Sequence, residues 1–339
     1  MLTVEPGQTV EIQTLSGAGL YQDFHPVEEL KSMGVPEREV LPDLIEFWQT
    51  RKSRPREGRA QHLVTGPIYI EGAEPGDTLE VQILDVQPRV PWGINGTQAF
   101  SGVLSKTYPG YRVGDKGADI PPETDDAPSE EWRIIRTEHS EDGLVGVYPS
   151  GIRVPLSPFM GVMAVAPMPV LGEPGVDVEG VQSSGPPGAF GGNLDVKHLT
   201  AGSSLFLPVF HPGAQFYVGD PHGAQGDGEV SGLAIEQSML GVFRFILHKN
   251  LETKGPRAET ATHHLIMGID VDLDRALRKA TENVVDFIVL RYKIRPSEAF
   301  SIASVAVDFT ISEAVDGTQV VTAFVPKSIF PHKVGDFPL

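Results

Sequence analysis

Two glycine-rich segments and one isolated glutamate concentrate polar side chains within apolar surroundings. Residues 191–198 read GGNLDVKH, residues 219–229 read GDPHGAQGDGE, and Glu236 follows the second segment. Asp220 and His222 are two positions apart, so an extended chain would place both side chains on one face. The glycines would let the backbone turn tightly and approach a ligand closely.

These residue types suggest either a metal site or a structural turn. Imidazole together with carboxylates suits a divalent cation such as zinc. An Asp-Gly-rich loop is also a common turn in which the aspartate caps its own backbone. Spacing alone leaves both interpretations open. Other histidines, among them His25, His62 and the His263-His264 pair, are weaker ligand candidates.

Composition excludes several chemistries. The chain has 339 residues and no cysteine, so it has no disulfide, no cysteine zinc ligand and no cysteine nucleophile. It has no Gly-x-Ser-x-Gly elbow, Walker A motif or dinucleotide fingerprint, and Ser203-Ser204 lacks the glycines of a serine amidase loop.

Charge and hydropathy indicate a soluble protein. The net charge is −18, which disfavours nucleic acid and anionic membranes as partners. The first residues do not resemble a signal peptide, and the apolar run 161–171 is too short to cross a bilayer. We expect a cytoplasmic protein.

The elements that must position these residues are mostly strands. Short apolar-rich runs with turn signals between them predict a β-sandwich or barrel. The expected strands are residues 2–4, 10–14, 67–71, 78–86, 132–137, 144–148, 152–156, 205–210, 215–218, 229–236 and 242–248. Polar segments 28–61 and 112–131 are expected to be surface excursions, with a short helix over 41–50.

The C-terminal part has a different pattern. Apolar residues recur at helical spacing from about residue 272 to 292, a second helix begins at Pro296-Ser297, and a strand is expected over 319–325. We therefore predict a mainly β fold with an α+β C-terminal part containing two helices. The predicted domains are residues 1–260, carrying the site motifs, and residues 261–339.

Several motifs in the same order resemble the acetamidase/formamidase family. They are LTVEPGQTV, TGPIYIEGAEPGDTLEVQILDV, IRVPLSPFMGVMAVAP, the GGNLD and GDPHGAQGDGE segments, and SEAFSIASVAVDFTISEAVDG. The resemblance implies hydrolysis of small carboxamides to a carboxylate and ammonia. It also implies a β-rich N-terminal part, an α+β C-terminal part and associated metal ions.

With cysteine and serine nucleophiles disfavoured, the hypothesis is a metal-dependent amidase. Zinc can lower the pKa of a water molecule to about 7. Asp195, Asp220 and His222 are expected to hold a divalent metal, zinc being favoured and calcium an option for a second, structural ion. The remaining roles are a general base, supplied by Glu229 or Glu236, and orientation of the substrate amide, by Asn193 and Gln225.

Two alternatives stay open. The same fold could hydrolyse another C–N bond, as in urea or guanidine-like compounds. It could also be a non-catalytic β protein that binds a metabolite and carries a structural metal.

The motifs also make two structural predictions. The segments 191–198 and 219–229 should meet in one pocket, because strands 205–210 and 215–218 between them could form a hairpin. The protein is expected to form homo-oligomers, with residues 160–171 as a candidate interface if they are not core.

Overall fold

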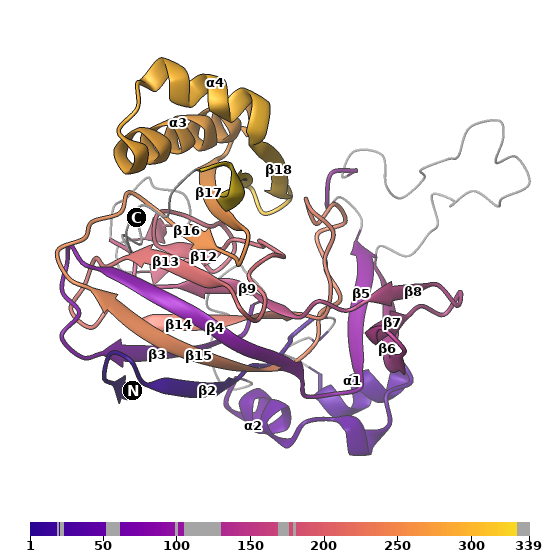
Figure 1. Ribbon diagram of the computed structural model, residues 1–339. Helices are drawn as coiled ribbons and strands as arrows, with labels where there is room; N and C mark the ends of the chain where they lie inside the picture. The colour runs from indigo at the N-terminus through magenta and orange to yellow at the C-terminus, as the bar shows by residue number, and fades with distance from the viewer. Residues whose placement is uncertain are drawn as a thin grey trace, which may run out of the picture.

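The computed structural model describes residues 1–18, 20, 24–51, 62–98, 101–104, 130–168, 176–178 and 181–330. Its largest element is an eight-stranded sheet that joins strands from both ends of the chain (Figure 1). In spatial order its strands are β18 (Asp308–Glu313), β19 (Gln319–Pro326), β17 (His263–Asp270), β16 (Arg257–Glu259), β13 (Ser204–Pro208), β4 (Thr78–Pro88), β15 (Met239–His248) and β2 (Thr9–Gln13).

A five-stranded sheet packs against this one. Its order is β1 (Leu2–Val4), β3 (Val64–Ile70), β14 (Phe216–His222), β9 (Phe159–Ala164) and β12 (Gly191–Asn193). The two sheets share one hydrophobic core, in which Phe216 of β14 packs against Phe243 and Phe245 of β15. The arrangement is a β-sandwich. The mainly β fold class is confirmed, and of the two predicted architectures the described residues form the sandwich and no closed barrel.

A four-stranded antiparallel meander stands beside the sandwich. It consists of β5 (Trp92–Gln98), β6 (Glu130–Ser140), β7 (Gly143–Val147) and β8 (Arg153–Pro155). Two short helices, α1 (Pro26–Ser32) and α2 (Pro42–Arg51), cover the meander, and the 3₁₀ turn η1 (Glu37–Glu39) lies between them in the chain. Leu30 of α1 and Leu44 of α2 belong to one cluster with Trp92 and Ile94 of β5. The polar excursion 28–61 thus contains helices where it is described. Two further short strands, β10 (Val176–Val178) and β11 (Val181–Gln182), pair with each other.

Two C-terminal helices lie together over the end of the eight-stranded sheet (Figure 1). They are α3 (Leu273–Tyr292) and α4 (Pro296–Ala306), and the 3₁₀ turn η3 (Lys327–Ile329) follows β19. Asp272 caps α3 by accepting a hydrogen bond from the Arg275 amide. Both predicted helices are confirmed. The amphipathic pattern of the first is confirmed as well, because α3 buries its apolar stripe on β17 and β19.

Two predicted elements are wrong. Residues 229–236 form no strand but an irregular segment, in which Glu236 makes only isolated bridges to Ile94 and His222. Residues 205–210 and 215–218 form no hairpin, because β13 pairs with β4 and β16 in one sheet while β14 pairs with β3 and β9 in the other.

Other predictions concern boundaries and surfaces. The division at residues 260 and 261 remains a prediction, and β16 and β17 pair across it. Residues 160–165 are buried core, so this part of the candidate interface is not available, and residues 169–171 lie outside the described residues. Most of the excursion 112–131 also lies outside them. Among the helices described, none has the length and apolar character needed to cross a bilayer.

Candidate active site

The central strand of the five-stranded sheet carries the first pair of site residues. Asp220 and His222 lie near the end of β14, flanked by β3 and β9. His222 is buried, and its Nε2 lies 3.2 Å from Asp220 Oδ2. The two-residue spacing therefore brings both side chains to one place, as the sequence predicts.

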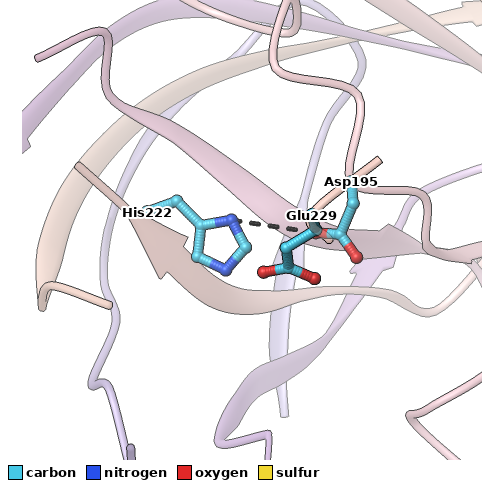
Figure 2. Close-up of side chains that lie close together, drawn as sticks. All are labelled: Asp195, His222 and Glu229. Atoms are coloured by element: carbon cyan, nitrogen blue, oxygen red, sulfur yellow. Dashed lines mark ion pairs between the residues drawn. The ribbon is translucent and has the colours of Figure 1, made fainter. Parts of the chain in front are cut away.

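Three more acidic residues complete the surroundings of the imidazole. Asp195 Oδ1 lies 3.7 Å from His222 Nδ1, and Glu236 Oε2 lies 3.4 Å from His222 Nε2. Glu229 approaches the same ring, as Figure 2 shows together with Asp195. The segments 191–198 and 219–229 thus meet around one imidazole, although the hairpin expected to join them is absent.

Backbone contacts hold these side chains in place. The Asp195 and Leu194 amides donate to the Gly161 carbonyl of β9. Glu236 exchanges two backbone hydrogen bonds with Ile94 of β5, both 2.8 Å long. The site is therefore fixed between the sandwich and the meander.

Three of the acidic residues have a left-handed backbone. The φ values are 47° for Asp195, 51° for Asp220 and 43° for Glu229. Such conformations are uncommon for residues other than glycine and cost about 1–3 kcal/mol each. Their concentration around one histidine is typical of a functional site.

An open space lies between the side chains. A Cβ atom at Gly161 would lie 2.5 Å from Asp195 Oδ1, 2.6 Å from Asp220 Oδ2 and 2.8 Å from His222 Cε1. Glycine at this position of β9 therefore keeps the space between the imidazole and the two carboxylates free.

The structure adds residues that sequence reasoning missed. Glu313, the last residue of β18, and Asp316, in the turn that follows, place carboxylate oxygens within 4.8 Å of those of Asp195 and Glu229. A possible signal was the pair of acids three positions apart before Gly317 at the end of a strand. His62, considered a weak candidate, lies with Nε2 3.8 Å from Asp220 Oδ2 and Nδ1 3.0 Å from the Ser184 carbonyl oxygen.

Asn193 and Gln225 use their amide nitrogens within the protein. Asn193 Nδ2 donates to Asp316 Oδ2, and Gln225 Nε2 donates to the Asp195 carbonyl oxygen at 3.0 Å. Their carbonyl oxygens, Oδ1 and Oε1, are buried and have no hydrogen-bond partner within the described part of the chain.

Burial and crowding of like charges shift the pKa values. Burial, followed by the charges of Glu229 and Asp220, raises the pKa of Asp195 well above its usual range. Burial also raises the pKa of Glu229, against the opposing effect of His222. Burial raises the pKa of Glu313 to about 8 and that of Asp316 to about 6.

The pKa values of His222 and Asp220 are shifted in the directions expected of an ion pair. Burial opposes ionisation of both, but Glu236 and Asp220 raise the pKa of His222 well above its usual range. His62 and His222 lower the pKa of Asp220. The site thus gathers more carboxylates than its own positive charges can neutralise.

These side chains border a pocket of about 350 Å³. Asp220, Glu229, Glu236 and Asp316 line its charged side, together with His62. The remaining lining is largely small or apolar.

Comparison with known proteins decides the family. A profile described as the Acetamidase/Formamidase family matches residues 57–175 and 174–332, which include every candidate site residue. The chain belongs to this family. The resemblance seen in the sequence motifs is confirmed.

Relatives agree in sequence and in fold. A formamidase of Methylophilus methylotrophus is 28% identical over 326 residues, covering 80% of this chain and 78% of the relative. An acetamidase of Mycolicibacterium smegmatis is 34% identical over 210 residues, covering 50% of this chain and 49% of the relative, so the match spans about half of that protein. The crystal structure of an acetamidase from Bacillus halodurans superposes with a TM-score of 0.71 at 26% identity, covering 99% of this chain and 94% of the other.

Proposed function

We propose that this protein hydrolyses small linear carboxamides to a carboxylate and ammonia. The observation that carries the proposal is the buried imidazole of His222, surrounded by Asp195, Asp220, Glu229 and Glu236 beside a pocket. Support comes from relatives named formamidase and acetamidase. An amide is a poor electrophile and its leaving nitrogen needs a proton, so hydrolysis requires both electrostatic activation and proton transfer.

The ligands expected from the sequence are Asp195, Asp220 and His222, with zinc the favoured divalent ion. Asp195 lies beside Nδ1 of His222 and Asp220 beside Nε2, so the ligand atoms that lie within 4.8 Å of one another form two sets: Asp195, His222 and Glu229, or Asp220, His222 and Glu236. The second set would hold the ion and leave Glu229 free, and both His222 ring nitrogens are buried without hydrogen-bond partners within the described residues. When bound, the ion supplies Lewis-acid polarisation of the amide oxygen and a lowered pKa for a nearby water molecule.

The carboxylates of Asp195, Glu313 and Asp316 offer a different set of ligands, and Glu229 beside them stays free as the base. Calcium prefers oxygen ligands, so this set would suit the second, structural ion expected from the sequence.

Glu229 is the favoured general base. It lines the pocket, whereas Glu236 is engaged by the Ala234 amide at 2.9 Å through Oε1 and lies 3.4 Å from His222 Nε2 through Oε2. In this role Glu229 accepts the water proton as the new C–O bond forms. It returns the proton to the nitrogen as the C–N bond breaks, which releases ammonia.

Asn193 and Gln225 are proposed to orient the amide. Their nitrogens are occupied, and neither residue is among those that line the pocket of about 350 Å³. Their buried, unpartnered carbonyl oxygens Oδ1 and Oε1 would accept hydrogen bonds from a substrate NH₂ that enters between the carboxylates.

Ammonia release tests the proposal. The purified protein, as prepared, after chelation and after reloading with zinc, is assayed against formamide, acetamide, longer amides and urea. We expect ammonia from amides, loss after chelation and recovery with zinc. Full turnover after chelation, with metal analysis showing no ion, would contradict the metal role. Release from urea alone would favour the alternative C–N hydrolase.

A further inference from the structure

The pocket beside the carboxylates is large for the smallest amides. Its volume is about 350 Å³, within the range of roughly 300–1,000 Å³ that holds drug-sized ligands. We propose that the substrate is a neutral amide whose acyl group is apolar and several carbons long, larger than formamide or acetamide. This inference rests on the proposed amide hydrolysis and names its substrate class.

Five apolar residues are among those that line the pocket. We call them the apolar wall: Leu15, Ala18, Leu63, Leu233 and Val315. They come from four separate parts of the chain: the segment after β2, the residue before β3, the segment 223–236 and the turn between β18 and β19. Each of these segments thus offers an apolar residue that a hydrocarbon group in the pocket can contact.

The apolar wall is supported from behind. Ala18 is a buried member of the cluster that includes Leu30 of α1, Leu44 of α2 and Trp92 of β5, and Leu15 and Leu63 pack against this cluster. Burying an apolar group against such a surface makes the free energy of binding more favourable, because neither the wall nor the group then remains in contact with water.

The carboxylates indicate where the amide end of a substrate lies. Asp220, Glu229 and Glu236 border the pocket with Asp316, while the apolar wall contributes no charge. A substrate that places its amide beside the carboxylates leaves its acyl chain to the rest of the pocket, where residues of the apolar wall can contact it.

The same charges exclude one class of amide. No Lys or Arg lines the pocket among the residues described, and His62 is its one basic side chain there. A carboxylate on the acyl chain would enter a space bordered by four acidic residues, with no Lys or Arg among the described lining residues to pair with it. Neutral amides are therefore favoured over anionic ones.

A chain-length series tests the inference. The zinc-loaded protein is assayed for ammonia release with formamide, acetamide, butyramide and hexanamide. Burial of one methylene group corresponds to about a fourfold gain, so we expect kcat/KM to rise by about this factor per methylene until the wall is covered. Values that are highest for formamide or acetamide would overturn the inference while leaving amide hydrolysis intact. No release from any amide would refute both.

Variants of Leu233 locate the acyl chain. Leu233→Trp narrows the pocket, and Leu233→Ala removes wall contacts without overpacking. Each should lower the hexanamide-to-acetamide ratio of kcat/KM, by about tenfold for the tryptophan variant. The matched control is Val305→Trp on α4, where the side chain is 82% exposed and outside the pocket. An unchanged ratio in folded Leu233 variants would overturn the placement.

Two amides of similar size, one neutral and one anionic, test the exclusion of anions. Valeramide is compared with the analogue in which its terminal methyl group is replaced by a carboxylate. We expect the anionic analogue to be at least about 100-fold poorer in kcat/KM, whereas comparable values would show that the acyl group does not lie in the acidic pocket.

Discussion

Glu229 combines burial, a left-handed backbone and a place in the lining of the pocket. Glu229→Gln preserves the shape of the side chain but cannot accept a proton. We expect kcat to fall by about 10²–10⁴, the usual contribution of general acid–base catalysis, with little change in bound metal. Steady-state kinetics and metal analysis of the same preparation measure both effects.

Two comparisons separate the roles of the glutamates. Glu252→Gln, at an exposed position after β15, should retain full activity. Loss of metal in Glu229→Gln would make Glu229 a ligand and Glu236 the better base. If neither Glu229→Gln nor Glu236→Gln lowers turnover even tenfold, the base lies elsewhere.

The acidic cluster also predicts how the metal-free protein responds to pH. The pKa values of Glu313, about 8, and Asp316, about 6, lie above those of the unfolded chain. A raised pKa gives stability that is full below the unfolded value and is lost as pH rises through the folded value. The unfolding free energy should therefore fall between about pH 5 and pH 8, by up to about 1.4 kcal/mol per pH unit for each proton involved.

Denaturant unfolding of chelated protein across this range measures the effect. The decline should be smaller in Glu313→Gln. It should also be smaller with a bound divalent cation, because cation binding displaces the protons and offsets the repulsion between carboxylates. A chelated protein that gains stability from pH 5 to pH 8 would contradict this account of the cluster.

At the scale of elements, β9 positions the site by lacking a side chain at Gly161. Gly161→Ala would place a methyl group against Asp195, Asp220 and His222. Displacement of reacting groups by about 1 Å can cost 10²-fold in rate, so we expect a loss of about that size, with lower metal content.

Gly226→Ala is the matched control. Gly226 belongs to the segment between β14 and β15, yet a Cβ there meets no atom within 4 Å. It should retain activity within about threefold, and circular dichroism should show both variants folded. Full activity in Gly161→Ala would show that the space is not used.

Features of the helices and strands that depend on local sequence could be predicted. The helix over 273–292 was predictable because its apolar stripe repeats at helical spacing and faces a sheet. Asp220 and His222 were predictable because their two-residue spacing needs only an extended chain. Both inferences depend on neighbours in sequence.

Features that depend on contacts between residues far apart in the sequence could not be predicted from the sequence. The strand expected at residues 229–236 is absent because the segment is tied at its two ends to different strands, Gly228 to Ser312 of β18 and Glu236 to Ile94 of β5. Glu313 and Asp316 join the site only because β18 and β19 extend the same sheet as β4. No local pattern records a meeting between residues 195 and 316.

For the whole molecule we predict a homo-oligomer, since closed symmetric assemblies are common among soluble enzymes. Light scattering should give a mass that is a multiple of 36.6 kDa. Residues 160–165 cannot supply the contact because they are buried in the sandwich core. A mass of a single chain at working concentration would refute the prediction.

The strand order of the eight-stranded sheet has a consequence for synthesis of the protein on the ribosome. The apolar side chains of β4, Leu79, Val81 and Ile83, are buried between the sheets, and β4 lies between β13 and β15. Gln82 pairs with Ser204, which is translated 122 residues later. At about 5–20 residues per second the nascent chain therefore exposes this strand for roughly 6–24 seconds before its first partner in the sheet emerges.

An unpaired apolar strand can pair with another chain during that interval. The last neighbour of β4, β15, ends only at His248, so a chain interrupted before that point leaves one edge of β4 open. Truncated products of this protein should consequently aggregate, and the growing polypeptide should depend on chaperones that shield its first strands until translation has passed the middle of the message.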